Sequence, residues 1–265
     1  MHATRFFYAS INVFMLEQSQ ENPILKLGPN LNGQVLSFFG ARHTNDPTDI
    51  QFNHLKQFWN EFLNIVKNKS VVLTEGVIRA IPLGYEDSIQ QHGETGAAQW
   101  LAKEAGVDVI YSEPSVEEQR KWLCASLDSQ IVAYTMIVQN LAVWFRQTRQ
   151  LSFDEAVNRS VKREAKFLGI YGFTPDDVWF YNQHRKLFGE QHLEDRSFLD
   201  SISDPRKSDT PVNTVVALRT KIRNEYLLSA ITEAWKSGKN IFIVYGKGHL
   251  TALERPLQEL ITSTV

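Results

Sequence analysis

The chain has 265 residues, of which 43% are hydrophobic and 22% are charged, and its formal net charge is -2. This length corresponds to one large domain or two small ones, and it is enough to bury a substantial core. Because the composition offers no excess of basic residues to neutralise a phosphate backbone, it argues against nucleic-acid binding.

The N-terminal residues 1–16, MHATRFFYASINVFML, place one arginine before an apolar stretch, a feature of signal peptides. Asn12 interrupts the stretch and no small-residue cleavage site follows, so we expect a cytoplasmic protein over an exported one. The longest apolar run elsewhere, 131–145, is too short to span a bilayer. It predicts a core helix, and we expect no integral membrane segment.

Short runs of β-forming residues alternate with helical patterns along the chain. The strands are predicted at 34–40, 70–76, 107–114 and 240–246. Residues 48–67 carry an apolar stripe at three-and-four spacing, and residues 94–104 and 212–237 also fit helices. This alternation is typical of parallel strands joined by helical crossovers. We therefore predict an α/β fold with a mostly parallel sheet and helices on both of its faces.

The middle of the chain is mainly helical. Ser115 with Glu118, and Ser152 with Glu155, form the capping-box pattern that opens a helix. Residues 191–212 have no apolar period and predict a long loop, of the kind that often serves as a lid. We predict a single α/β domain over residues 1–265, with a helical insertion at about 115–212.

Polar residues stand at the carboxyl ends of all four predicted strands, where the two glutamates close their strands and the two histidines follow theirs. They are His43, Glu75, Glu113 and His249. The two histidines belong to the segments GARH and GKGH, which share the pattern Gly-x-x-His. One histidine after a strand is more often a turn or core residue than a ligand, but the repeated pattern favours a functional role. Because ligands bind beyond the carboxyl ends of parallel strands, we expect these side chains to line one rim of the sheet.

These residue types point to metal chemistry. Two imidazoles and a carboxylate leave coordination positions open for water and substrate, and they suit Zn, Mn, Co or Fe. We predict a metal site formed by His43, Glu75 and His249. Glu94, in the segment HGETG, is a candidate general base. Arg223, on the helix predicted at 212–237, is a candidate for stabilising an oxyanion.

Other polar residues have simpler explanations. Glu113 fits a solvated strand end as well as it fits a site, and Arg219 fits a solvated charge on the flank of its helix. The stretch 184–192, HRKLFGEQH, matches no helical face and predicts solvated polar residues. Cys124 is the only cysteine, which excludes an internal disulfide, and its apolar helical context favours a buried structural thiol over a nucleophile.

Four segments together resemble the TraB/PrgY/GumN and TIKI superfamily, which is related to erythromycin esterase and to the haem-binding ChaN proteins. The segments are GARH (40–43), TEG (74–76), RNEYLLSAI (223–231) and FIVYGKGHL (242–250). The superfamily is characterised by two Gly-x-x-His motifs, an acidic residue after an early strand, and an arginine on the helix before the last strand. The resemblance implies an erythromycin esterase/ChaN-like α/β fold whose motif residues meet in one cleft.

The resemblance also implies roles for individual residues. His43 and His249 match the motif histidines, Glu75 the acidic position and Arg223 the arginine, and Glu94 matches a further acidic position. TIKI proteins are metal-dependent peptidases and the esterase branch opens a macrolactone. We therefore expect a hydrolase that uses a divalent metal ion to cleave a peptide, ester or lactone bond in a small-molecule or peptide substrate.

Two alternatives remain open. One is a non-catalytic protein of the same fold that binds haem or a peptide signal. The other is a metal-independent esterase in which His43 acts as the general base.

Overall fold

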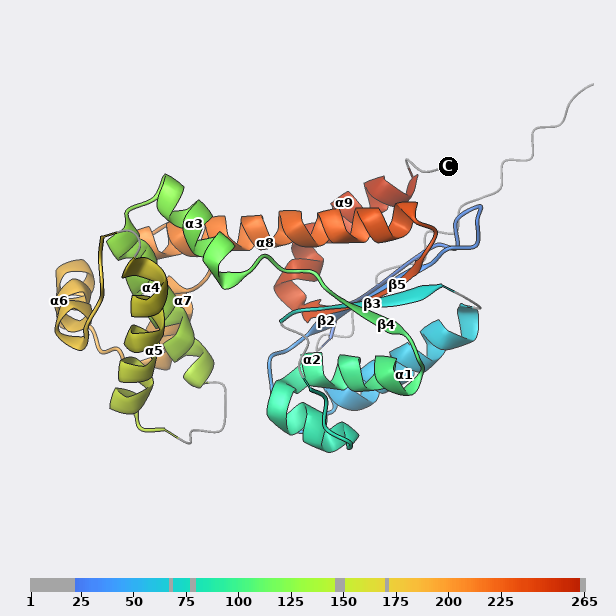
Figure 1. The fold of residues 1–265 in the computed structure, drawn as a ribbon, viewed down its shortest axis with the longest axis horizontal. Coiled ribbons are helices and arrows are strands. Elements are labelled where there is room, and N and C mark those ends of the chain that lie inside the picture. The colour runs from blue at the N-terminus through green and yellow to red at the C-terminus, as the bar shows by residue number, and fades with distance from the viewer. Residues whose placement is uncertain (1–21, 67–68, 77–79, 146–150, 170–171, 263–265) are drawn as a thin grey trace, which may run out of the picture. The chain divides into compact units, whose positions relative to one another are not determined.

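The computed structural model shows a protein of two compact units (Figure 1). It describes residues 22–66, 69–76, 80–145, 151–169 and 172–262. Unit 1 comprises Met1–Ser112 and Leu227–Val265, and unit 2 comprises Glu113–Tyr226. The helical insertion predicted at about 115–212 falls within unit 2. The N-terminal stretch 1–16, interpreted above as a non-secreted start, lies outside the described residues. Within the described ranges, no helix combines the length and the apolar character that a membrane span requires.

Unit 1 contains a five-stranded sheet in the order β1-β2-β5-β3-β4. The strands are β1 (Ile24–Leu27), β2 (Leu36–Ala41), β3 (Ser70–Thr74), β4 (Asp108–Tyr111) and β5 (Asn240–Gly246). β2, β5, β3 and β4 run parallel to one another, whereas β1 pairs antiparallel with β2 at one edge. The predicted α/β architecture with a mostly parallel sheet is therefore confirmed. The four predicted strands are present, and the short β1 is additional.

Helices cover both faces of this sheet. They are α1 (Gln51–Ile65), α2 (Tyr85–Glu104), α9 (Lys247–Thr262) and the last part of α8 (Pro211–Lys236). Side chains of β5 alternate between the two faces: Phe242 and Val244 pack with α1 and α2, whereas Ile241 and Ile243 pack with α8 and α9. Because all four are buried, β5 has the continuous apolar sequence of a central parallel strand.

The apolar stripe predicted at 48–67 is the buried face of α1. Phe58, Trp59 and Phe62 of this helix surround the ring of Phe242, with ring centroids 4.9–5.3 Å from it. Burying a side chain of this size stabilises the fold by about 1.5–3 kcal/mol. The aromatic cluster therefore fixes α1 against the middle of the sheet.

Unit 2 is helical in the described residues. Besides the first part of α8, it contains α3 (Val116–Ser126), α4 (Ser129–Trp144), α5 (Phe153–Leu168), α6 (Asp177–Phe188) and α7 (Arg196–Ile202). Both predicted capping boxes are confirmed, with Ser115 and Glu118 at the start of α3 and Ser152 and Glu155 at the start of α5.

The segment 191–212 differs from the predicted loop because it contains α7. The Asp195 carboxylate accepts hydrogen bonds from the backbone N–H groups of Ser197 and Phe198, and Leu199 and Ile202 are buried. A helix of two turns places too few residues on its buried face for a period to be visible in the sequence. The prediction of a structureless loop was therefore wrong over 196–202.

A buried ion pair joins α3 to α5 within unit 2. Arg120 Nε donates to Glu164 Oε2 at 3.0 Å, and Arg120 Nη2 donates to Glu164 Oε1 at 2.5 Å. The Glu164 side chain is fully inaccessible and that of Arg120 is 5% exposed. Two parallel hydrogen bonds of this kind satisfy both groups and fix the geometry of the pair.

Removing one partner of this pair should destabilise unit 2 strongly. We expect Glu164→Gln, which keeps the side-chain shape, to lower the free energy of unfolding by about 3 kcal/mol because Arg120 is left buried without its counter-charge. Denaturant unfolding followed by circular dichroism measures this loss. The matched control is Glu225→Gln in the exposed pair with Lys221, which should cost under about 0.5 kcal/mol. Equal losses in the two variants would contradict the expectation.

Candidate metal centre

The carboxyl ends of β2, β5 and β3 lie side by side at one edge of the unit 1 sheet. β5 lies between the other two strands, with Gly246 paired to Ala41 of β2 and Val244 paired to Thr74 of β3. His43 follows β2 by two residues, and Glu75 follows β3 directly. Because Gly246 ends the central strand, it lies between the backbone positions from which these two side chains extend.

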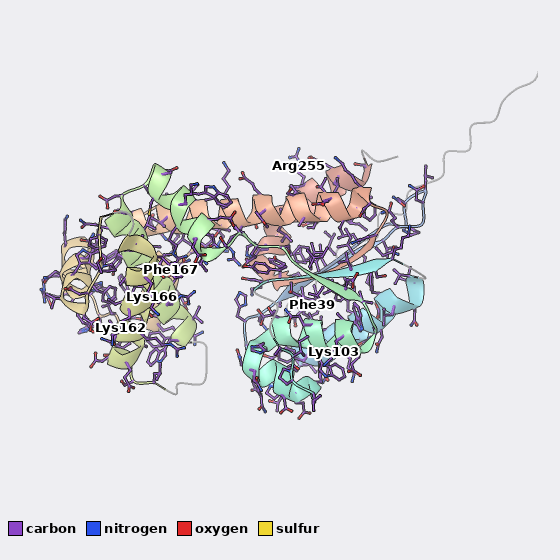
Figure 2. The ribbon with its side chains drawn as sticks, viewed as in Figure 1. Phe39, Lys103, Lys162, Lys166, Phe167 and Arg255 are labelled. Atoms are coloured by element: carbon purple, nitrogen blue, oxygen red, sulfur yellow. The ribbon has the colours of Figure 1, made fainter. Side chains whose placement is uncertain are left out.

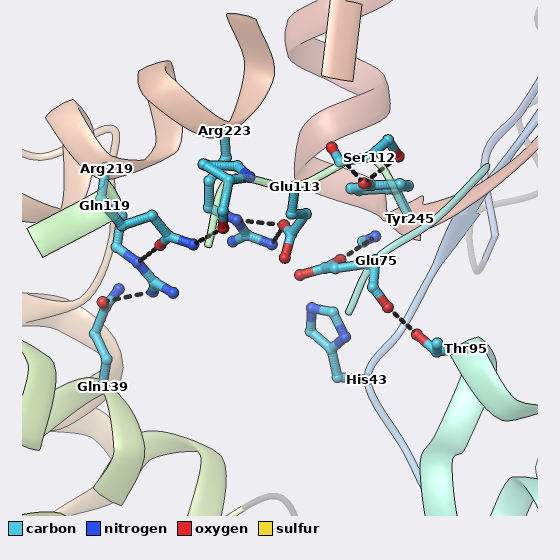
Figure 3. A network of polar contacts seen from close by, with 12 residues as sticks. His43, Glu75, Thr95, Ser112, Glu113, Gln119, Gln139, Arg219, Arg223 and Tyr245 are labelled. Carbon is cyan, nitrogen blue, oxygen red and sulfur yellow. Dashed lines mark hydrogen bonds and ion pairs between the residues drawn. The ribbon is translucent and has the colours of Figure 1, made fainter. Parts of the chain in front are cut away.

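His43, Glu75 and Glu94 converge at this edge. Figure 3 shows the side chains of His43 and Glu75. One potential ligand atom from each residue lies within 4.8 Å of the other two. The Nδ1 atom of His43 is 2.5 Å from Glu94 Oε1. Glu75 Oε2 accepts a hydrogen bond of 3.0 Å from the backbone N–H of Gly246. The prediction that His43 and Glu75 lie together is thus confirmed, and Glu94 lies with them.

Glu94 reaches the site because α2 is kinked at the residue before it. Gly93 has φ +58° and ψ -142°, and a Cβ there would lie 2.9 Å from the carbonyl oxygen of Thr44. Both features require glycine. The kink starts a new helical segment at Glu94, where a helix was predicted to begin, and the Glu94 side chain is only 9% exposed. Next to it, the Thr95 hydroxyl donates to the carbonyl oxygen of Glu75.

Gly246 allows His43 and Glu75 to approach the same stretch of backbone. A Cβ at this position would lie 2.9 Å from His43 Nε2 and 3.4 Å from Glu75 Oε2. Nε2 is therefore the ring nitrogen that faces β5, while Nδ1 faces Glu94. When Nδ1 donates its hydrogen to Glu94, the neutral imidazole carries its lone pair on Nε2.

His249 has a different environment. It lies in the first turn of α9, which begins at Lys247 with no loop after β5, and it is 7% exposed. Its ring meets the ring of Tyr245 edge-on at 5.5 Å. The Tyr245 hydroxyl is in turn 2.6 Å from Ser112 Oγ. The predicted metal site consisted of His43, Glu75 and His249. Among the described residues, the group that could hold a metal ion consists of His43, Glu75 and Glu94.

Arg223 and Glu113 pair with each other in unit 2. Arg223 Nε donates to Glu113 Oε1 at 2.6 Å, and the two side chains are only 13% and 9% exposed (Figure 3). Glu113 is therefore not a solvated strand end. Arg219 donates to the side-chain oxygens of Gln119 and Gln139 at 2.9 and 2.8 Å, so it is not simply a solvated flank charge. The oxyanion role of Arg223 stays a prediction.

Two further titratable groups are structural. His184 was expected to be solvated, but it is buried. Its Nε2 donates to the carbonyl of Gln191 and its Nδ1 accepts from the Tyr134 hydroxyl, each at 2.6 Å. Burial lowers the pKa of His184 and favours this neutral form. Cys124 is half-buried, and burial raises the pKa of its thiol, which opposes formation of a reactive thiolate.

A methyl group at position 246 should block this centre without unfolding unit 1. We expect Gly246→Ala to weaken Zn²⁺ or Mn²⁺ binding by at least about tenfold because its Cβ displaces the His43 imidazole. Stability should change by less than about 1 kcal/mol, since the partly exposed imidazole can rotate away. Isothermal titration calorimetry measures the binding. Gly248→Ala is the control, because a Cβ there meets nothing within 4 Å. Unchanged binding in Gly246→Ala would contradict the expectation.

The chain matches no model of a known protein family, and it shows no significant similarity to curated proteins or to solved structures. The resemblance to the TraB/PrgY/GumN and TIKI superfamily therefore stays a prediction that rests on its four motifs.

Proposed function

We propose that unit 1 is a metal-dependent hydrolase that cleaves a peptide, ester or lactone bond at the carboxyl edge of its sheet. The observation that carries this proposal is the convergence of His43, Glu75 and Glu94, whose potential ligand atoms lie within 4.8 Å of one another. His43 follows β2, Glu75 follows β3 and Glu94 lies in α2, so the fold and not a local sequence pattern brings them together.

The donor set suits a divalent ion. Imidazole nitrogens and carboxylate oxygens are typical ligands of Zn, Mn, Co and Fe, and here His43 and Glu75 would supply one of each. With metal–ligand bonds of about 2.0–2.2 Å, opposite ligand atoms lie at most about 4.4 Å apart, so a small contraction of the group suffices. Two carboxylates this close repel each other when both are ionised, and a cation would offset that repulsion.

Each residue has a distinct role in the proposal. Glu94 accepts a hydrogen bond from His43 Nδ1 and thereby orients the ring so that Nε2 binds the ion, an arrangement common around metal-bound histidines. Glu75, held by the backbone N–H of Gly246, is the second ligand. A bound divalent ion would lower the pKa of a water molecule and polarise the scissile carbonyl. The second carboxylate oxygen of Glu94 can accept the proton that the attacking water loses.

The short contact between His43 and Glu94 also favours a second candidate, a hydrolase without a metal. At 2.5 Å from Nδ1, the Glu94 carboxylate holds the imidazole in the tautomer in which Nε2 is a base. In this candidate His43 Nε2 takes the proton of the attacking water directly, and Glu94 stabilises the imidazolium that forms.

Substitution of the three residues tests the metal-dependent hydrolase. We expect His43→Ala and Glu75→Gln to lose the metal, because each removes a ligand, and Glu94→Gln to weaken metal binding by about 10- to 100-fold. Elemental analysis of the purified variants, together with a panel of ester, lactone and peptide substrates, measures both effects. His192→Ala, an exposed histidine of unit 2, is the control. Full metal content and turnover in His43→Ala would refute the proposal.

Removal of the metal separates the two candidates. After dialysis against a chelator, a metal-dependent hydrolase should lose its activity and regain it when Zn²⁺ or Mn²⁺ is added. The metal-free candidate retains its activity under the same treatment and loses it in Glu94→Gln. Turnover that survives complete metal removal would decide for the metal-free candidate.

A further inference from the structure

The outer face of α5 in unit 2 carries a line of positive charge. Arg159, Lys162, Arg163 and Lys166, here called the basic stripe, are all exposed and follow one another at the i, i+3, i+4 and i+7 positions that share one helix face. The opposite face of α5 is buried in the core of unit 2. Figure 2 shows Lys162 and Lys166 on successive turns of this helix, with Phe167 close by.

No direct ion pair neutralises the basic stripe in the described part of the chain. None of its four side chains makes a hydrogen bond or an ion pair there, whereas Arg120 of the same unit is bonded twice to Glu164. Arg159 with Arg163, and Lys162 with Lys166, are like charges at i,i+4 spacing, which destabilise a helix. This repulsion would be relieved by an anionic partner.

A surface groove of about 860 Å³ runs beside the basic stripe. The stripe lines one part of it, and the carboxylates of Asp154, Glu155 and Asp177 line another. Asp177 accepts a hydrogen bond of 2.8 Å from Asn158 Nδ2. The groove thus has a basic part with four cationic side chains and an acidic end with three carboxylates.

We propose that this groove binds an acidic segment of another polypeptide. A nucleic-acid backbone or an anionic membrane is negative throughout and would be repelled at Asp154 and Asp177. A peptide can place acidic residues over the stripe and a lysine or arginine at the acidic end. The stripe covers eight residues of helix and is about 10 Å long, which three to four residues of an extended peptide match.

The net charge of the chain favours a partner that binds in the groove over a polyanion attracted to the protein as a whole. Its formal net charge of -2 gives no long-range attraction for polyanions, so binding depends on the charges that line the groove. The proposal concerns unit 2 alone and does not depend on the metal centre of unit 1.

A labelled peptide tests the proposal with the full chain. The probe is a fluorescein-labelled peptide of four glutamates followed by two lysines, and fluorescence anisotropy measures its binding. We expect Lys162→Gln with Lys166→Gln to weaken binding by about 5- to 10-fold, and added salt to weaken it in the wild type. The matched control, Lys103→Gln with Lys236→Gln, removes two exposed lysines elsewhere and should leave binding unchanged.

Three outcomes would overturn the proposal. The first is equal affinity for an analogue in which glutamine replaces every glutamate. The second is equal weakening by the control pair, which would show that the overall charge and not the groove attracts the peptide. The third is tighter binding of a single-stranded oligonucleotide or of phosphatidylserine vesicles that is lost in the Lys162 and Lys166 variant, which would assign the stripe to a uniformly negative partner.

Discussion

The candidate centre of unit 1 depends on the parallel pairing of β5 between β2 and β3. This pairing sets Gly246 beside Ala41 and Val244 beside Thr74, and the Glu75 N–H extends the ladder by donating to Val244 O at 3.3 Å. A shift of β5 by one residue would turn its apolar side chains to the wrong faces of the sheet. The burial of Phe242 and Val244 against α1 and α2, and of Ile241 and Ile243 against α8 and α9, therefore fixes the register. The same register positions the N–H group that holds the Glu75 carboxylate.

Much of this arrangement could be predicted from the sequence, because it follows from local patterns. The apolar runs defined the four parallel strands, and the polar residues after them identified His43 and Glu75. The helical stripe of α1 and both capping boxes were likewise visible. α7 was missed because seven residues are too short to display a helical period, and the four-residue β1 was not recognised either.

The two Gly-x-x-His segments show where sequence reasoning stops. GARH continues beyond β2 without helical structure, and His43 contacts Glu94. GKGH instead passes directly into α9, and His249 is buried against Tyr245. The pattern is the same, but the backbone that follows it differs. The close position of Glu94 depends on the left-handed conformation of Gly93 and on its contact with Thr44, which a single sequence does not reveal. Tertiary packing, and not the local sequence, therefore determines the positions of His249 and Glu94.

The sheet of unit 1 is also protected at its borders. Its two edge strands, β1 and β4, have only four residues each, and prolines that cannot donate a backbone hydrogen bond lie nearby: Pro23 directly before β1 and Pro114 three residues after β4. The first residue of β4, Asp108, adds an exposed charge. Short, charged and proline-bounded edges offer a poor template for a strand from another molecule. The folded protein should consequently resist edge-to-edge aggregation in concentrated solution, even though its central strands are among the most apolar segments of the chain.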